Sequence, residues 1–170
     1  MASLIYIQAY IQSWPLTAIF GSALAAILLV LSYIDLREYR LPNPLTYSLI
    51  AIGLIWSYLR ADISAALIGA LAAYLSFVLI AWGFKRLRGI DGLGRGDAKL
   101  LAAGGAWCGW TALPMIVLFA SLLGILAALL APFKRQTGTQ VSSGEAENWI
   151  AFGPCLAAAI MAVWAAQQMV

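Results

Sequence analysis

Apolar runs that carry almost no charge alternate with short polar segments along the chain. The runs cover about residues 15–34, 44–59, 62–84, 100–131 and 149–169. Because a helix rises about 1.5 Å per residue, ~20 apolar residues cross the hydrocarbon core of a bilayer. Runs of about that length each predict one membrane-spanning helix, whereas the fourth run is too long for a single crossing.

The fourth run contains a turn signal at its centre. Its segment Gly109-Trp110-Thr111-Ala112-Leu113-Pro114 combines Gly and Pro, which interrupt helices, with a Trp typical of the membrane interface. Dividing the run there predicts about six spans in total. The expected fold class is an all-α integral membrane protein, a polytopic bundle of about six transmembrane helices, with residues 1–170 forming a single transmembrane domain.

The basic residues set the expected orientation. Nine of the ten Lys and Arg residues lie in the segments 35–40, 85–99 and 134–135, which the positive-inside rule places in the cytoplasm. Arg60 is then the one basic residue outside, and both termini face outward. The polar stretch 134–148 is expected to be a cytoplasmic loop.

Composition agrees with a membrane protein. The chain has 170 residues, of which 64% are hydrophobic and 10% charged, and a soluble domain of this size needs far less apolar content for one core. The net charge of +3 comes from short clusters without a continuous basic face, so nucleic-acid binding is not expected. The lipid bilayer is the expected partner, and the oligomeric state stays open.

Small and aromatic residues are assigned structural roles. Tryptophans near the span ends predict anchors at the membrane interfaces: Trp14, Trp56, Trp82, Trp110 and Trp149. The pairs Gly69/Ala73 and Gly105/Gly109 predict close approach between helices.

The chain contains no histidine. This absence excludes the Ser/His/Asp triad, the Cys/His dyad and any His-ligated metal centre. Cys108 and Cys155 match no C-x-x-C spacing, so neither a zinc site nor a disulfide is expected, and both are assigned to the core. Paired carboxylates remain, and they suffice for general acid/base hydrolysis.

Two acidic residues lie beside apolar segments at the same predicted boundary. Asp35 directly follows the apolar stretch 27–34, and Asp97 opens the first half of the divided run. Together they predict a catalytic pair. Taken singly, Asp35 is also compatible with a span-end residue paired with Arg37 or Arg40, and Asp97 with a helix N-cap.

Residues around the two aspartates suggest supporting roles. Gly94 and Gly96 predict close backbone approach to an extended substrate, whereas Pro42 and Pro44 predict a chain break that holds the first aspartate in position. Ordinary loop punctuation is an equal alternative for all four. Lys99 either offsets carboxylate charge or faces lipid headgroups, and the second role is favoured.

At these residues the chain resembles a known family. The segment Gly94-Arg95-Gly96-Asp97-Ala98-Lys99-Leu100-Leu101-Ala102-Ala103 resembles the second catalytic motif of the type IV prepilin peptidases, which are membrane aspartyl proteases of the GxGD class. Asp35 followed by Arg40-Leu41-Pro42-Asn43-Pro44-Leu45-Thr46 resembles the first motif, and Phe152-Gly153-Pro154 is a third match. The similarity extends over about residues 28–158.

The resemblance implies a function and a place. It implies an endopeptidase domain that removes the short basic leader of type IV prepilins or pseudopilins at the cytoplasmic face of the bacterial inner membrane. Asp35 and Asp97 would be catalytic, with Gly94, Gly96, Lys99, Pro42 and Asn43 as supporting residues and no cofactor. Since the paired C-x-x-C motifs of the methylating forms are missing from this chain, the resemblance implies the short, peptidase-only form.

The residues alone leave two other classes of function open. A small transporter or channel would use Asp35 and Asp97 as a proton or cation relay, although relay acids are expected nearer the middle of the membrane. A structural subunit that binds pilus assembly proteins would not require both acids.

Overall fold

The computed structural model describes residues 14–38, 41–88, 94–134 and 152–169, and the regular structure within these ranges is helical. The elements in chain order are α2 (Trp14–Glu38), α3 (Asn43–Leu59), α4 (Ile63–Arg88), α5 (Arg95–Cys108), the 3₁₀ helix η1 (Trp110–Ala112), α6 (Leu113–Lys134) and α7 (Gly153–Gln167). Most of the predicted loop 134–148 and both ends of the chain lie outside the described residues.

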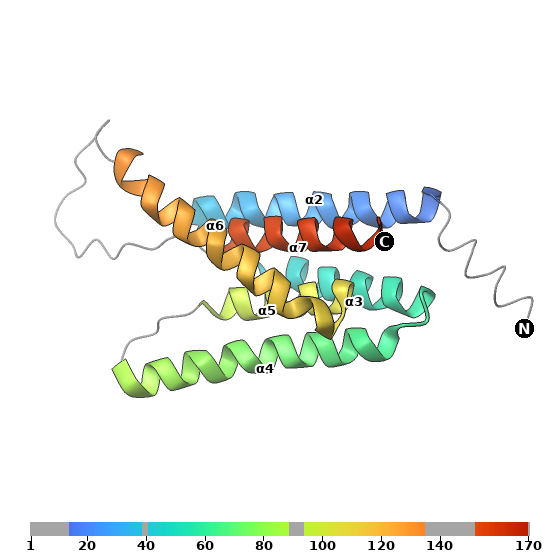
Figure 1. The fold of residues 1–170 in the computed structure, drawn as a ribbon, viewed down its shortest axis with the longest axis horizontal. Coiled ribbons are helices and arrows are strands. Elements are labelled where there is room, and N and C mark those ends of the chain that lie inside the picture. The colour runs from blue at the N-terminus through green and yellow to red at the C-terminus, as the bar shows by residue number, and fades with distance from the viewer. Residues whose placement is uncertain (1–13, 39–40, 89–93, 135–151, 170) are drawn as a thin grey trace, which may run out of the picture.

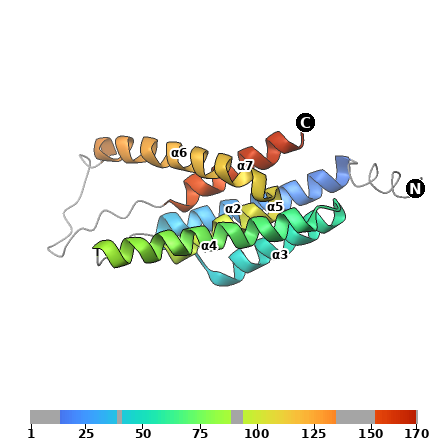
Figure 2. The same cartoon turned by 60° about the horizontal axis from the view of Figure 1, so that its bottom comes forward.

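The helices form an elongated bundle in which consecutive helices run in alternate directions (Figure 1). The turned view shows α6 and α7 on one side, α3 and α4 on the other, and α2 with α5 between them (Figure 2). Each residue from 100 to 108 in α5 is buried, so α5 is the central helix. Its 14 residues extend only ~21 Å, less than the ~30 Å of bilayer hydrocarbon.

The predicted fold class is confirmed. Three helical segments are long and apolar enough to cross a membrane: Pro15–Glu38, Ile63–Leu87 and Trp110–Leu130. The other three α-helices of the described residues, α3, α5 and α7, are shorter and alternate with the long ones in chain order. The chain is therefore an all-α, polytopic membrane protein.

The predicted division of the long apolar run is also confirmed. α5 ends at Cys108, and Gly109 follows with φ 77°, a left-handed conformation that glycine adopts without steric cost. Pro114 then stands in the first turn of α6, where its missing N–H breaks no helical hydrogen bond.

Close approach between helices occurs at the predicted glycines. Gly105 of α5 lies against the backbone of Gly69 of α4, and a Cβ on Gly105 would overlap the Gly69 carbonyl group. Since no side chain separates the two backbones, α4 and α5 pack more tightly than helices that carry larger residues at the contact.

The tryptophans predicted to be interfacial anchors differ in their exposure, and the prediction is wrong for Trp56. Trp82 and Trp110 are 60% and 53% exposed, as interfacial anchors require. Trp56 is only 2% exposed, because its ring packs against Phe20 and Trp164 at centroid distances of 5.0 and 6.2 Å. Trp149 and the side chain of Trp14 lie outside the described residues.

Both cysteines are free thiols in the structure. Cys108 is buried at the end of α5, in agreement with its assignment to the core. Cys155 is only partly buried near the start of α7, so that assignment holds for one of the two thiols.

Candidate active site

Asp35 lies near the end of α2, three residues before the helix finishes at Glu38. Its side chain is only 6% exposed, which is exceptional for a carboxylate, since burial without partners costs several kcal/mol. The residue therefore needs a hydrogen-bond donor within the bundle.

That donor is the backbone of Gly153, the first residue of α7. Its N–H donates to Asp35 Oδ2 at 3.0 Å. The first N–H groups of a helix have no partner within the helix, and the helix dipole favours negative charge there. A Cβ on Gly153 would stand 2.5 Å from Asp35 Oδ2, so only glycine lets the carboxylate approach. The Phe152-Gly153-Pro154 motif thus positions Asp35.

The simpler role considered for Asp35, an ion pair with Arg37, does not fit the observed contacts. The Arg37 guanidinium lies over the ring of Tyr33, 5.0 Å from its centre. Both residues are exposed on the outer side of α2, whereas Asp35 points into the bundle. Arg40 lies outside the described residues.

Asp97 is the third residue of α5 and is partly buried. The N-cap position belongs to Gly94, whose backbone is extended and accepts a hydrogen bond from the Asp97 N–H at 3.1 Å. The N-cap role predicted as the alternative for Asp97 is therefore wrong. A carboxylate in the first helical turn is stabilised by the helix dipole, so this position suits a charged Asp97.

The two glycines before Asp97 have different surroundings. A Cβ on Gly94 would lie 3.1 Å from Asp97 Oδ2, so the carboxylate folds back over this glycine. A Cβ on Gly96 would lie 2.9 Å from the Leu41 side chain, in the connection between α2 and α3. Gly96 therefore has a packing role that was not predicted from the sequence. The predicted role of both glycines, close approach of the backbone to a substrate, stays a prediction.

Lys99 connects the first and second motifs. Its Nζ donates to Asn43 Oδ1 at 2.6 Å and lies over the ring of Tyr47, 5.1 Å from its centre. This contact differs from the headgroup role favoured for Lys99. Asn43 opens α3 directly after Pro42, whose carbonyl accepts hydrogen bonds from the N–H and hydroxyl of Thr46. The beginnings of α3 and α5 are thereby held together.

The two aspartates meet at one end of the bundle, where α2 ends and α5 and α7 begin. Asp35 ends up near the end of α2 and Asp97 in the first turn of α5, so both carboxyl groups belong to this end. Two neighbouring carboxyl groups in partly buried surroundings can hold one shared proton, which is the requirement for paired general acid/base chemistry. Within the described residues, no three Cys, Asp or Glu side chains form a group that could hold a metal ion.

Comparison with known proteins gives a consistent result. A sequence model described as the type IV leader peptidase family matches residues 22–129, which include both aspartates. No solved structure matches the chain significantly.

Individual relatives carry the name prepilin leader peptidase/N-methyltransferase. The Burkholderia pseudomallei (strain K96243) protein is 45% identical over 83% of this chain and 43% of its own length. The Escherichia coli (strain K12) protein is 42% identical over 82% of this chain and 63% of its own length. The Dickeya chrysanthemi protein is 39% identical over 92% of this chain and 54% of its own length. The chain thus spans about half the length of these relatives.

Proposed function

This chain belongs to the type IV leader peptidase family, and we propose that it is a membrane aspartyl endopeptidase. Its substrates would be type IV prepilins or pseudopilins, from which it removes the short basic leader. The observation that carries the proposal is the placement of Asp35 and Asp97, which come from separate motifs, at the same end of the bundle.

The proposed mechanism uses both carboxyl groups. Because two neighbouring carboxylates cannot both ionise cheaply, the pair shares one proton and titrates as a unit. The ionised member takes a proton from water as the water attacks the scissile carbonyl carbon. The protonated member polarises the carbonyl oxygen and then donates its proton to the leaving amine.

The hydrogen bond from Gly153 assigns the oxygens of Asp35. Oδ2 is engaged by the Gly153 N–H, so we assign Oδ1 to the attacking water or the scissile carbonyl. A fixed carboxylate costs less reorganisation in the transition state than a mobile one.

The proposed location is the cytoplasmic face of the bacterial inner membrane. α4 ends at the same end of the bundle as the two aspartates and carries Lys85 and Arg86 there (Figure 1). The positive-inside rule places such clusters in the cytoplasm. A prepilin crosses the same membrane through its hydrophobic helix, so the leader junction arrives at this level.

A peptide assay tests the proposal directly. The purified protein in detergent or lipid is incubated with a synthetic prepilin-like peptide, and mass spectrometry locates the cut. We expect cleavage at the leader junction and its loss in Asp35→Asn and in Asp97→Asn, because each carboxyl group has a role that the other cannot fill.

The matched control is Glu38→Gln, which removes an exposed acid from the same helix end. This variant should cleave like the wild type. Near wild-type turnover by either folded Asn variant would contradict the proposal. A transporter that uses the two aspartates as a relay would leave the peptide uncut.

A further inference from the structure

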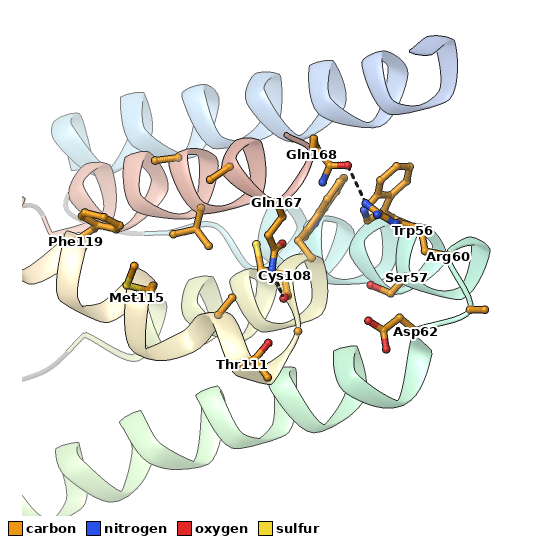
Figure 3. A pocket seen from close by; sticks show the side chains of 17 residues that line it. Trp56, Ser57, Arg60, Asp62, Cys108, Thr111, Met115, Phe119, Gln167 and Gln168 are labelled. Carbon is orange, nitrogen blue, oxygen red and sulfur yellow. Dashed lines mark hydrogen bonds between the residues drawn. The ribbon is translucent and has the colours of Figure 1, made fainter. Parts of the chain in front are cut away.

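A cavity of about 880 Å³ lies at the end of the bundle opposite to Asp35 and Asp97. The end of α3, the connection that follows it, the end of α5 with η1, and the adjoining parts of α6 and α7 surround it (Figure 3). The proposed peptidase chemistry uses none of its lining residues.

One half of the cavity is polar and carries both signs of charge. The Arg60 guanidinium lies over the ring of Trp56 at 5.3 Å and donates one hydrogen bond to Gln168 Oε1 at 2.8 Å. Asp62, two residues further on, lines the same cavity with an exposed carboxylate. No ion pair joins Arg60 to Asp62 in the described part of the chain. Both charges are therefore available to a ligand.

The other half of the cavity is apolar and continues along the bundle. Met115 and Phe119 of α6 lie on the far side from the charged residues (Figure 3). Phe119 and Ala162 also line a second hollow of about 410 Å³ between α6 and α7. The remaining lining of this hollow is aliphatic: Leu122, Leu123, Ile125, Leu126, Leu129, Ala158 and Ala159. An apolar groove thus leads from the charged cavity toward the middle of the membrane.

These features together select one class of ligand. The occupant needs an anionic group for Arg60, an N–H-bearing cation for Asp62 and a long apolar tail for the groove. We propose that the cavity binds one phospholipid whose headgroup carries a phosphate and a primary ammonium group. A lipid with an anionic headgroup alone would bring like charge to Asp62. A soluble zwitterion would leave the apolar groove unfilled.

This inference is independent of the proposed peptidase activity, and lipid binding tests it. The delipidated protein is mixed with equal amounts of phosphatidylethanolamine, phosphatidylcholine and phosphatidylglycerol, and native mass spectrometry measures which lipid stays bound. We expect phosphatidylethanolamine to be retained about tenfold over the others. The trimethylated ammonium of phosphatidylcholine has no N–H to donate, and phosphatidylglycerol has no cation.

Two headgroup variants separate the charges. Arg60→Gln and Asp62→Asn should each reduce phosphatidylethanolamine retention about tenfold, because each removes one charge-assisted hydrogen bond. The side chain of Asp62 is exposed, so its variant should keep the fold even if Arg60→Gln loosens the contact with Gln168. Arg86→Gln is the matched control, since Arg86 also lies over a tryptophan ring, that of Trp82, at 5.4 Å.

A tail variant tests the groove. Ala162→Phe would fill the junction of the two hollows and should lower retention, whereas Ala26→Phe at an exposed position of α2 should not. Equal retention of the three lipids, or retention that none of the cavity variants changes, would overturn the proposal. The proposal would also be overturned if phosphatidylglycerol were retained as strongly as phosphatidylethanolamine and Asp62→Asn left the retention of both lipids unchanged.

Discussion

The two ends of the helix bundle both gather charged side chains, but they hold them in different ways. At one end lie two acidic groups, Asp35 and Asp97, and the Gly153 N–H holds the more buried of them. At the other end, Arg60 and Asp62 have opposite charges and line an open cavity without an ion pair between them. Two carboxylates repel each other, so surrounding groups must hold them in place. A positive and a negative side chain that form no ion pair can instead bind a ligand that carries both a negative and a positive group.

The largest effect is expected at the scaffold of Asp35. Gly153→Ala places a methyl group 2.5 Å from Asp35 Oδ2, so the carboxylate must move. A displacement of about 1 Å in a catalytic group can cost ~100-fold in rate, and we expect a loss of that order in peptide cleavage. Phosphatidylethanolamine retention at the opposite end should stay unchanged.

Gly83→Ala is the control for this variant, since a Cβ at Gly83 would meet nothing within 4 Å. It should cleave like the wild type. Unchanged cleavage by Gly153→Ala would show that the contact between Gly153 and Asp35 has no catalytic importance. Neither end of the bundle would then depend on a side chain held in a fixed position.

A smaller effect is expected at the link between the two motifs. Lys99→Met removes the hydrogen bond to Asn43, which is worth about 1 kcal/mol at a partly exposed position, so cleavage should fall about fivefold. Asn43→Ala should produce a similar loss, and the double variant should be no worse than either single one.

The control for this pair is Arg37→Met, which removes an exposed cation from the same end of the bundle. Additive losses in the double variant would mean that Lys99 and Asn43 act separately. The positive charge of Lys99 would then be important in itself, as the role in offsetting carboxylate charge requires.

The smallest effect is expected in the aromatic cluster between the two ends. Trp107 Nε1 donates to the Leu49 carbonyl oxygen at 2.9 Å, whereas Trp164 Nε1 has no partner among the described residues. Trp107→Phe should therefore reduce the free energy of unfolding by about 1 kcal/mol more than Trp164→Phe. Denaturant unfolding in detergent measures the difference, and equal losses would indicate that a water satisfies Trp164.

The elements of the fold could be predicted because they depend on local signals. Membrane spans follow from runs of apolar residues, and the interruption at Gly109 follows from turn chemistry within a single segment. The placement of Asp35 and Asp97 at the same end of the bundle could be predicted from the number and order of the spans. Their catalytic role stays a proposal.

Contacts between distant segments could not be predicted in the same way. The N–H of Gly153 reaches Asp35 from a different helix, and Lys99 reaches Asn43 from α5 to α3. Hydropathy indicates how deep Trp56 lies in the membrane but not which side of its helix faces the bundle, so its burial was missed. The cavity beside Arg60 likewise depends on three stretches of the chain that are far apart in sequence: residues 56–62, 107–119 and 162–168.

The short central helix has a consequence for the supply of water. Hydrolysis consumes one water molecule for each bond broken, and bilayer hydrocarbon contains almost none. With its 14 residues, α5 is about 9 Å shorter than the hydrocarbon is thick, so the backbone at one or both of its ends would lie below the lipid surface. Non-helical backbone at that depth must either be covered by protein or line a water-filled cavity. Under the proposed mechanism, any water that reaches this backbone would also be the supply for the two aspartates.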